Sequence, residues 1–201
     1  MTAAATAERP SLPGPLGPDL MRHLRDVDEA RSEAAALLDG LSEVQLNWRP
    51  NPERWSIAQN VTHLTTVGRI YLPHIDDAMS TARSRGWRRP GPFTYGPLES
   101  WYARWLEPPP RYRLRAPRAF KPQPVQPLGD VRTGFVGLQD DLADRVRAAQ
   151  GLDLRRAKVT LHFTKLLRIS LGTAFAALLA HQRRHLWQAR QVRKEPTFPV
   201  G

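Results

Sequence analysis

Apolar residues recur at spacings of three and four in four separate stretches, and this pattern constrains the fold of the 201-residue chain more than any other feature. Such spacing places the apolar side chains on one face of a helix. The stretches begin near residues 19, 56, 130 and 171. Four long amphipathic helices, with one long crossover among their connections, predict an all-α four-helix bundle with a crossover excursion. The apolar positions are Leu20, Leu24, Val27, Ala30, Ala34, Leu37 and Leu41; then Ile57, Val61, Leu64, Tyr71 and Ile75; then Val131, Phe135, Leu138, Leu142, Val146 and Ala149; then Leu171, Ala174, Leu178 and Val192.

Polar and proline residues mark the expected helix boundaries. Asp19 and Asp130 are typical N-caps of the first and third helices. Ser56 followed by Gln59 forms a capping-box sequence and predicts that the second helix starts there. A bend is expected at Pro73, because proline removes one backbone hydrogen bond from a helix.

Ten of the nineteen prolines lie between Pro90 and Pro127. No long helix can run through such a region, so residues 83–129 are predicted to form an ordered excursion over the bundle. One short helix fits within it, at about residues 97–106, with Trp101, Tyr102 and Trp105 as packing residues. The expected organisation is a flexible segment at 1–18, the bundle at 19–195 including the excursion, and a tail at 196–201.

The composition limits the kinds of metal site that the chain can form and the cellular location expected for it. The chain has no cysteine, which excludes disulfides and thiolate metal ligands. No uncharged run approaches the roughly 20 residues that span a bilayer, and no signal peptide is evident, so we expect a cytoplasmic protein without a membrane segment. The net charge of +11 is regional, with basic excess at 83–121 and 154–194. Such a surface could attract anions, but a solvated arginine-rich surface is the favoured explanation, and specific nucleic-acid binding is not expected.

Two histidines continue the apolar stripe of the last helix. His181 and His185 stand four residues apart and therefore project from the same side of that helix, one turn apart. Buried imidazoles without partners would cost roughly 1–3 kcal/mol each. A metal ion would satisfy both, but so would a hydrogen-bonded core pair, and the spacing alone does not choose between them. His63 in the second helix is a third candidate; His23, His74 and His162 are expected to be ordinary surface or core histidines.

Two separate motifs resemble the DinB/YfiT-like family. The first is residues 41–50 (LSEVQLNWRP) followed by Trp55-Ser-Ile-Ala and His63-Leu; the second is residues 180–188 (AHQRRHLWQ). The resemblance covers about residues 20–195. It implies a four-helix bundle in which His63, His181 and His185 bind one zinc, nickel or similar divalent ion. It also implies packing roles for Trp48 and Trp55.

A site with three histidine ligands leaves coordination positions open, as in catalytic sites. The ion could lower the pKa of a bound water to about 7, or hold a thiolate. The resemblance therefore implies a metal-dependent enzyme acting on a small molecule, of the thiol S-transferase or hydrolase type, with a low-molecular-weight thiol as a candidate cosubstrate. A non-catalytic metal-binding or stress-response protein is the alternative, and a nucleic-acid binder is less favoured.

Residues around the histidines receive secondary roles in this interpretation. Arg183 and Arg184 lie between the two histidines of the last helix and are expected to be solvated, with an anionic substrate as their candidate ligand. Glu53, Asp76 and Asp77 are near enough in sequence to the second helix to be partners of a ligand histidine. A homodimer is compatible with the sequence but is not indicated by it.

Overall fold

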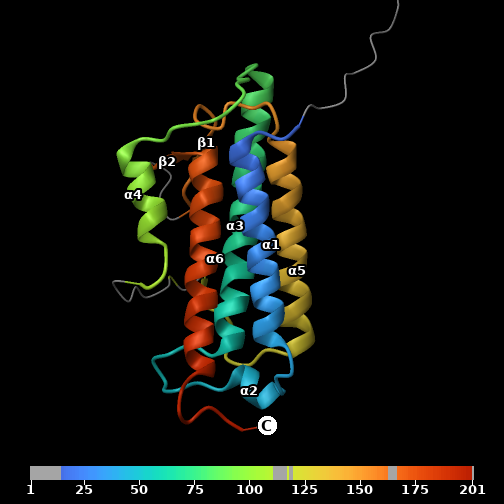
Figure 1. The fold of residues 1–201 in the computed structure, drawn as a ribbon, viewed down its shortest axis with the longest axis vertical. Coiled ribbons are helices and arrows are strands. Elements are labelled where there is room, and N and C mark those ends of the chain that lie inside the picture. Colours follow the sequence, from blue (N-terminus) through green and yellow to red (C-terminus); the bar gives the residue numbers. More distant parts are fainter. Residues whose placement is uncertain (1–14, 111–116, 118–119, 163–166, 201) are drawn as a thin grey trace, which may run out of the picture.

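The computed structural model describes residues 15–110, 117, 120–162 and 167–200. Four long helices form the bundle: α1 (Pro18–Leu38), α3 (Ile57–Ser84), α5 (Leu128–Ala148) and α6 (Leu171–Arg193). Helix α3 packs against α5 and α6, and α1 packs against the same two, so α1 and α3 lie diagonally opposite one another (Figure 1). The predicted all-α bundle is confirmed.

Shorter elements lie outside the four bundle helices. Helix α2 (Glu43–Asn47) occupies the connector after α1, and α4 (Pro97–Trp105) lies beside α6 in the proline-rich excursion (Figure 1). Strands β1 (Lys158–Thr160) and β2 (Arg168–Ser170) form a small antiparallel hairpin, with Val159 opposite Ile169. The helix at 97–105 was predicted, whereas α2 and the hairpin were not. None of the helices in the described part of the chain has the length and hydrophobicity needed to cross a bilayer.

Two predicted helix caps are wrong. Helix α1 starts one residue before Asp19, with Gly17 as N-cap and Pro18 in the first turn, where its fixed φ angle suits a helix. Asp19 is instead buried and accepts hydrogen bonds from the Phe93 amide at 3.0 Å and the Arg22 guanidinium at 2.8 Å. The α5 helix has Pro127 as N-cap and so begins before Asp130.

The capping box at the start of α3 is confirmed. The Ser56 hydroxyl accepts from the Gln59 amide, and the Gln59 side chain accepts from the Ser56 amide, both at 3.1 Å. Helix α3 continues through Pro73 to Ser84. The start of α3 is thus fixed by local hydrogen bonds.

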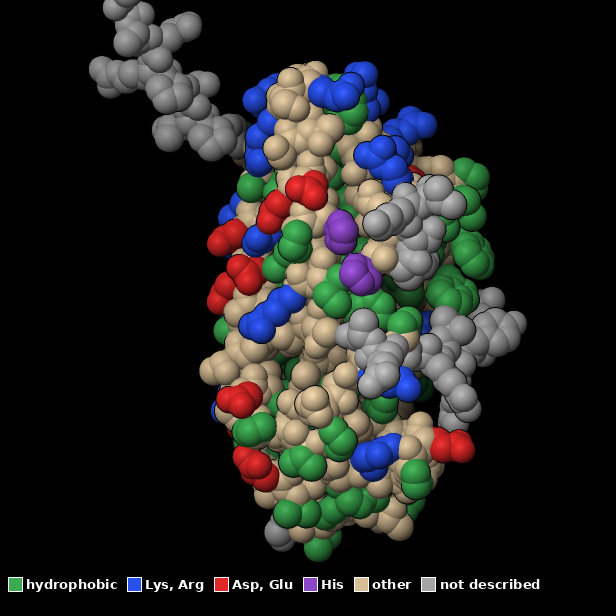
Figure 2. All heavy atoms as spheres, turned by 180° about the vertical axis from the view of Figure 1, so that it is seen from behind, with side chains coloured by type: hydrophobic (Ala, Val, Ile, Leu, Met, Phe, Trp, Pro, Cys, Tyr) green, Lys and Arg blue, Asp and Glu red, His purple; other side chains and the backbone are tan. Residues whose placement is uncertain are grey.

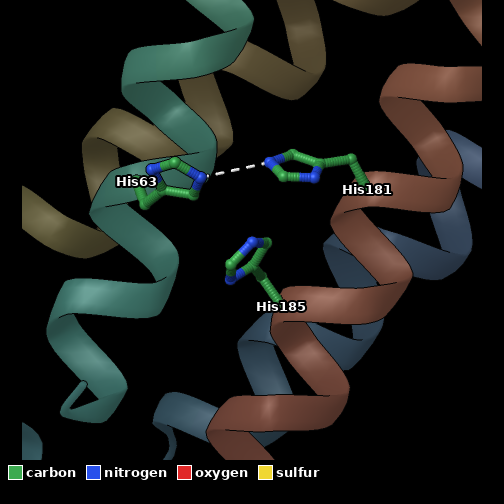
Figure 3. A group of neighbouring side chains, drawn as sticks. All are labelled: His63, His181 and His185. Carbon is green, nitrogen blue, oxygen red and sulfur yellow. Dashed lines mark hydrogen bonds between the residues drawn. The ribbon is translucent and has the colours of Figure 1, made fainter. Parts of the chain in front are cut away.

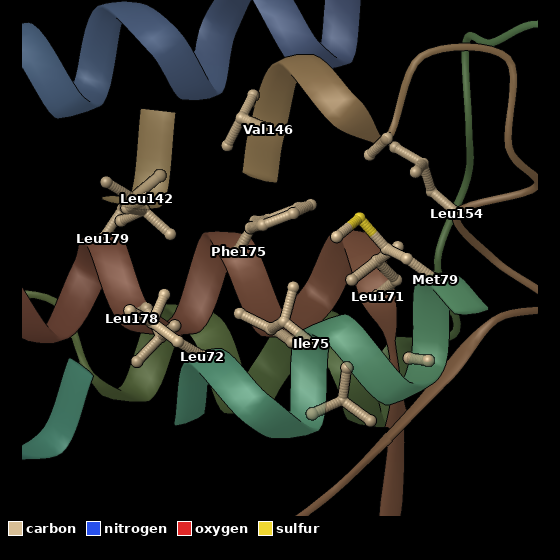
Figure 4. Packing of buried hydrophobic residues seen from close by; sticks show 14 of the residues in the cluster. Leu72, Ile75, Met79, Leu142, Val146, Leu154, Leu171, Phe175, Leu178 and Leu179 are labelled. Carbon is tan, nitrogen blue, oxygen red and sulfur yellow. The ribbon is translucent and has the colours of Figure 1, made fainter. Parts of the chain in front are cut away.

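Buried apolar residues form two clusters along the bundle axis. One surrounds Phe175 on α6, where leucine, isoleucine and methionine side chains from α3, α5 and α6 meet (Figure 4). The other lies toward α2 and includes Phe135 and Leu186. Along α3 the clusters meet between Leu64 and Val67, and along α6 between Leu179 and Leu186. Polar side chains at this junction are therefore held between two packed cores.

Trp101 does not take the packing role predicted for it. It is 54% exposed and stacks on Trp105, with ring centroids 6.1 Å apart, on the outer side of α4. Tyr102 and Trp105 are partly buried.

Candidate metal centre

Helices α3 and α6 bring the three predicted histidines together at the junction of the two core clusters. His63 extends from α3, and His181 and His185 extend from successive turns of α6, so that all three rings enter the space between these helices (Figure 3). Ser170 caps the start of α6 by accepting from the Thr173 amide at 3.3 Å. Each helix therefore carries its histidines from a start that its own sequence fixes.

The ring nitrogens of the three histidines converge. The Nε2 atoms of His63 and His181 are 3.2 Å apart, and one ligand atom from each of the three side chains lies within 4.8 Å of the others. Two imidazole nitrogens bound to one tetrahedral ion at about 2.1 Å would lie about 3.4 Å apart. The donor atoms and their spacing therefore fit a divalent ion bound by three imidazoles.

In two of the histidines, the ring nitrogen that faces away from the other two rings has a hydrogen-bond partner. The Nδ1 atom of His63 lies 2.7 Å from the carbonyl oxygen of Phe120, and Nδ1 of His185 lies 3.0 Å from Oδ1 of Asn60. Metal-binding histidines in proteins commonly donate their second ring N–H to such an oxygen, which fixes the orientation of the ring.

Trp55 packs against two of the three rings. Its centroid is 4.8 Å from that of His63 and 5.7 Å from that of His185, with the latter pair stacked at 28°. Trp55 therefore packs, as the resemblance implied, and the rings that it packs against are those of two site histidines. It restricts the movement of the His63 and His185 rings.

Burial keeps all three imidazoles neutral at pH 7. Desolvation lowers the pKa of His63, although its hydrogen bond to the Phe120 carbonyl opposes the change. Desolvation, followed by the charges of His63 and Arg184, lowers the pKa of His181 to about 3. Desolvation and the neighbouring histidines lower the pKa of His185 well below its usual value. Neutral rings keep the lone pairs that a metal ion requires.

The cavity beside His181 is small. A cavity of about 10 Å³ borders His181, Gln182 and the apolar side chains of α3 and α5, and this volume holds about one water molecule. His181 itself keeps partial exposure, whereas His63 is 4% exposed. A substrate-sized molecule does not fit in this cavity.

Arg183 and Arg184 of α6 are partly and almost fully buried, respectively, instead of solvated as expected. Arg183 makes a two-point ion pair with Glu107, through Nε–Oε2 at 2.9 Å and Nη2–Oε1 at 2.6 Å, and its Nη1 lies 3.5 Å from Asp26. It ties the segment after α4 to α1 and α6. Arg184 is 7% exposed, with its guanidinium carbon 5.8 Å from the Trp105 ring centre.

The remaining histidines stay outside the site. His23 is buried beside Phe175, and His74 and His162 lie together with ring centroids 6.0 Å apart. This agrees with the surface or core roles expected for them.

The acidic residues suggested as partners of a ligand histidine do not take that role. Asp76 pairs with Arg145 at 2.9 Å, and Glu53 and Asp77 are exposed. Asn60 and the Phe120 carbonyl contact the site histidines instead. Asn60 could have been suspected from sequence because it lies three residues before His63, but no sequence signal points to a main-chain carbonyl 57 residues away.

Comparison with known proteins gives a family but no individual relative. A family model described as the DinB superfamily matches residues 26–189, which include all three site histidines. No curated protein and no solved structure matches the chain.

Proposed function

Because the chain belongs to the DinB superfamily, we propose that it is a divalent-metal-dependent enzyme acting on a small molecule, of the thiol S-transferase or hydrolase type. The observation that carries the proposal is the convergence of three neutral imidazoles at one point between α3 and α6. Zinc, nickel or a similar divalent ion suits this donor set, since imidazole is a preferred ligand of both metals. Three protein ligands would leave coordination positions for a small molecule, as catalytic sites do.

The bound ion would supply Lewis acidity, which makes a coordinated water or thiol easier to deprotonate. The chain's own contribution is to hold the donor nitrogens in place and to exclude bulk water. The two apolar clusters on either side of the histidines exclude bulk water from the site. Electrostatic interactions are stronger in such a site than in water.

Arg184 is the residue that we assign to an anionic substrate or thiol. Desolvation is the main cause of the lowered pKa of His181 and His185, and the positive charge of Arg184 lowers both further. The same charge would attract an anion held near these rings. Arg183 is engaged by Glu107 and Asp26 and serves better as an anchor of the excursion.

A non-catalytic metal-binding protein is the second candidate function. It is favoured by the cavity of about 10 Å³ beside His181, which leaves no room there for a substrate. A substrate of the proposed enzyme would have to approach the histidines from another side.

Cobalt substitution separates these functions. The metal content of protein purified without an affinity tag is measured first, and the ion is then exchanged for cobalt. Sulfur coordinated to cobalt should give a strong near-ultraviolet charge-transfer band when a low-molecular-weight thiol is added. A hydrolase should show no such band but a pH–rate profile with an ionisation near neutrality that moves when the metal is exchanged.

Arg184→Ala supplies the control for substrate recognition. It should weaken the response to an anionic thiol without removing the metal. If a broad panel of thiols, esters and amides produced neither a spectral change nor turnover in the metal-loaded protein, the non-catalytic function would replace the enzymatic one.

A further inference from the structure

The orientation of the Asn60 side chain is fixed by a neighbour that can only accept a hydrogen bond. Asn60 is 2% exposed, and its Nδ2 donates to the carbonyl oxygen of Ser56 at 2.9 Å. The amide oxygen of Asn60 must therefore point the other way, where it lies 3.0 Å from Nδ1 of His185. Since this oxygen can only accept, the proton of that hydrogen bond belongs to His185.

A neutral imidazole carries one N–H and one lone pair. If His185 carries its proton on Nδ1, its lone pair is on Nε2. The carbonyl oxygen of Phe120 has the same effect on His63, because it accepts from Nδ1 at 2.7 Å and leaves Nε2 as an acceptor. Two separate acceptors thus impose the same tautomer on one histidine of α3 and one of α6.

His181 is the histidine that can adapt. With His63 Nε2 acting as an acceptor, His181 Nε2–H donates across the 3.2 Å gap between them. An ion bound by both nitrogens requires His181 to carry its proton on Nδ1 instead. The site therefore has two histidines in the tautomer that binds through Nε2 and one that changes tautomer when an ion enters.

We propose that Asn60 is a positioning residue of the metal centre, which sets His185 to bind through Nε2 while the Phe120 main chain sets His63. The inference rests on the proposed metal-binding function. It also gives the proline-rich excursion a role in the site, because Phe120 belongs to that excursion and is buried there. Outer hydrogen-bond partners of this kind typically change metal affinity by about 10–100-fold when they are removed.

Asn60→Leu tests the proposal, with Asn60→Asp as the conservative variant. Leucine has a similar volume but cannot accept from His185, whereas aspartate can. We expect Asn60→Leu to weaken zinc binding by about 10–100-fold, measured by competition with a chromogenic chelator, and Asn60→Asp to bind closer to wild type. Gln139→Leu is the matched control, since Gln139 is a fully buried amide on α5 that makes no hydrogen bond to a site histidine in the described structure.

Nitrogen-15 NMR of the metal-free protein provides a measurement that a purely structural role of Asn60 would not affect. Wild type and Gln139→Leu should show His185 protonated on Nδ1. Asn60→Leu should show a mixture of tautomers or the Nε2–H form. Thermal unfolding of the metal-free variants reports any loss of stability separately.

The outcomes separate this inference from the proposed function. Equal zinc affinity of wild type and Asn60→Leu, or a wild-type His185 protonated on Nε2, would overturn the positioning role. If wild type bound no divalent ion at all, the proposed function would fail and the positioning role with it, whereas metal binding without the expected His185 tautomer would overturn the positioning role alone. If Asn60→Leu did not fold, Asn60→Asp and the wild-type spectrum would decide it.

Discussion

The Nε2 atoms of His63 and His181 lie 3.2 Å apart, although 118 residues separate them in the chain. The contact depends on α3 packing against α6 in a register that places these side chains opposite each other. His185 adds a third imidazole from the next turn of α6, with its ring centroid 4.6 Å from that of His63.

Removing any one of the three histidines should remove most of the bound metal. Protein purified without an affinity tag should carry about one divalent ion per chain, and His185→Ala should lose most of it, because two imidazoles make a poor site. Elemental analysis measures the content, and His74→Ala is the control for loss of a histidine elsewhere. Full metal retention in His63→Ala, His181→Ala and His185→Ala alike would end the hypothesis.

His23 should make the protein sensitive to acid. Burial, with the charge of Arg22 second, lowers the pKa of His23 to about 4 from 6.5. Between pH 4 and pH 6.5 the His23 side chain is protonated in the unfolded chain but not in the folded protein. The free energy of unfolding therefore falls as the pH is lowered from about 6.5 to about 4, and His23 does not change it above pH 6.5. We expect this histidine to account for about 2 kcal/mol of lost stability between pH 7.5 and pH 5.

The measurement is urea unfolding of metal-free wild type and His23→Leu at both pH values. His23→Leu should lose less free energy of unfolding between pH 7.5 and pH 5 than wild type. The three site histidines contribute equally to that loss in both proteins. It should also stabilise the fold at pH 7.5, because neither ring nitrogen of His23 has a hydrogen-bond partner among the described residues. An equal loss in both proteins would show that His23 does not titrate in this way.

Two helical glycines should respond oppositely to alanine. A Cβ on Gly68 of α3 would lie 2.4 Å from a methyl carbon of Leu138, so Gly68→Ala should destabilise the fold by about 1–3 kcal/mol. A Cβ on Gly137 of α5 meets nothing within 4 Å, so Gly137→Ala should stabilise by up to about 1 kcal/mol. Free energies of unfolding from urea titration would test the pair, and the same sign for both would refute the packing argument.

Arg183 should anchor the excursion to the bundle. Arg183→Met removes the ion pairs with Glu107 and Asp26 and should speed proteolytic cleavage near α4, with a small loss of global stability of about 1 kcal/mol or less, since the pairs are partly exposed. Mass spectrometry of limited digests locates the cuts. Arg147→Met is the control, because its partner Asp144 lies in the same helix, α5. Unchanged cleavage in Arg183→Met would show that other contacts hold the excursion.

The basic surface should bind nucleic acid only weakly. Exposed arginines gather at one end of the bundle, where Arg85 and Arg156 lie over the Trp87 ring (Figure 2). Other basic residues of the same regions are paired with acids, as Lys158 is with Glu99. We expect sequence-independent DNA binding that disappears near physiological salt, because counterion release weakens it steeply. A dissociation constant below about 100 nM at about 150 mM salt in a fluorescence anisotropy titration would contradict this, since non-specific binding is typically much weaker.

Local sequence signals accounted for most of the bundle. The apolar spacing located α1, α3, α5 and α6, and the Ser56–Gln59 pair placed the start of α3 correctly, because a capping box depends only on residues in contact along the chain. The two aspartate caps failed because Pro18 lies in the first turn of α1 and Pro127 at the cap of α5, so both helices begin earlier. The spacing of four residues was sufficient to put His181 and His185 on one side of α6.

The tertiary structure decided what surrounds the histidines. The approach of His63 to α6, the ring of Trp55 against His185, and the hydrogen bond from His63 to the Phe120 carbonyl all join parts of the chain that are far apart in sequence. Helical periodicity gives the face on which a side chain lies, but not the helix that packs against that face or the depth at which it packs. A main-chain carbonyl is present at every residue, so only the folded chain could select that of Phe120 as the partner of a site histidine.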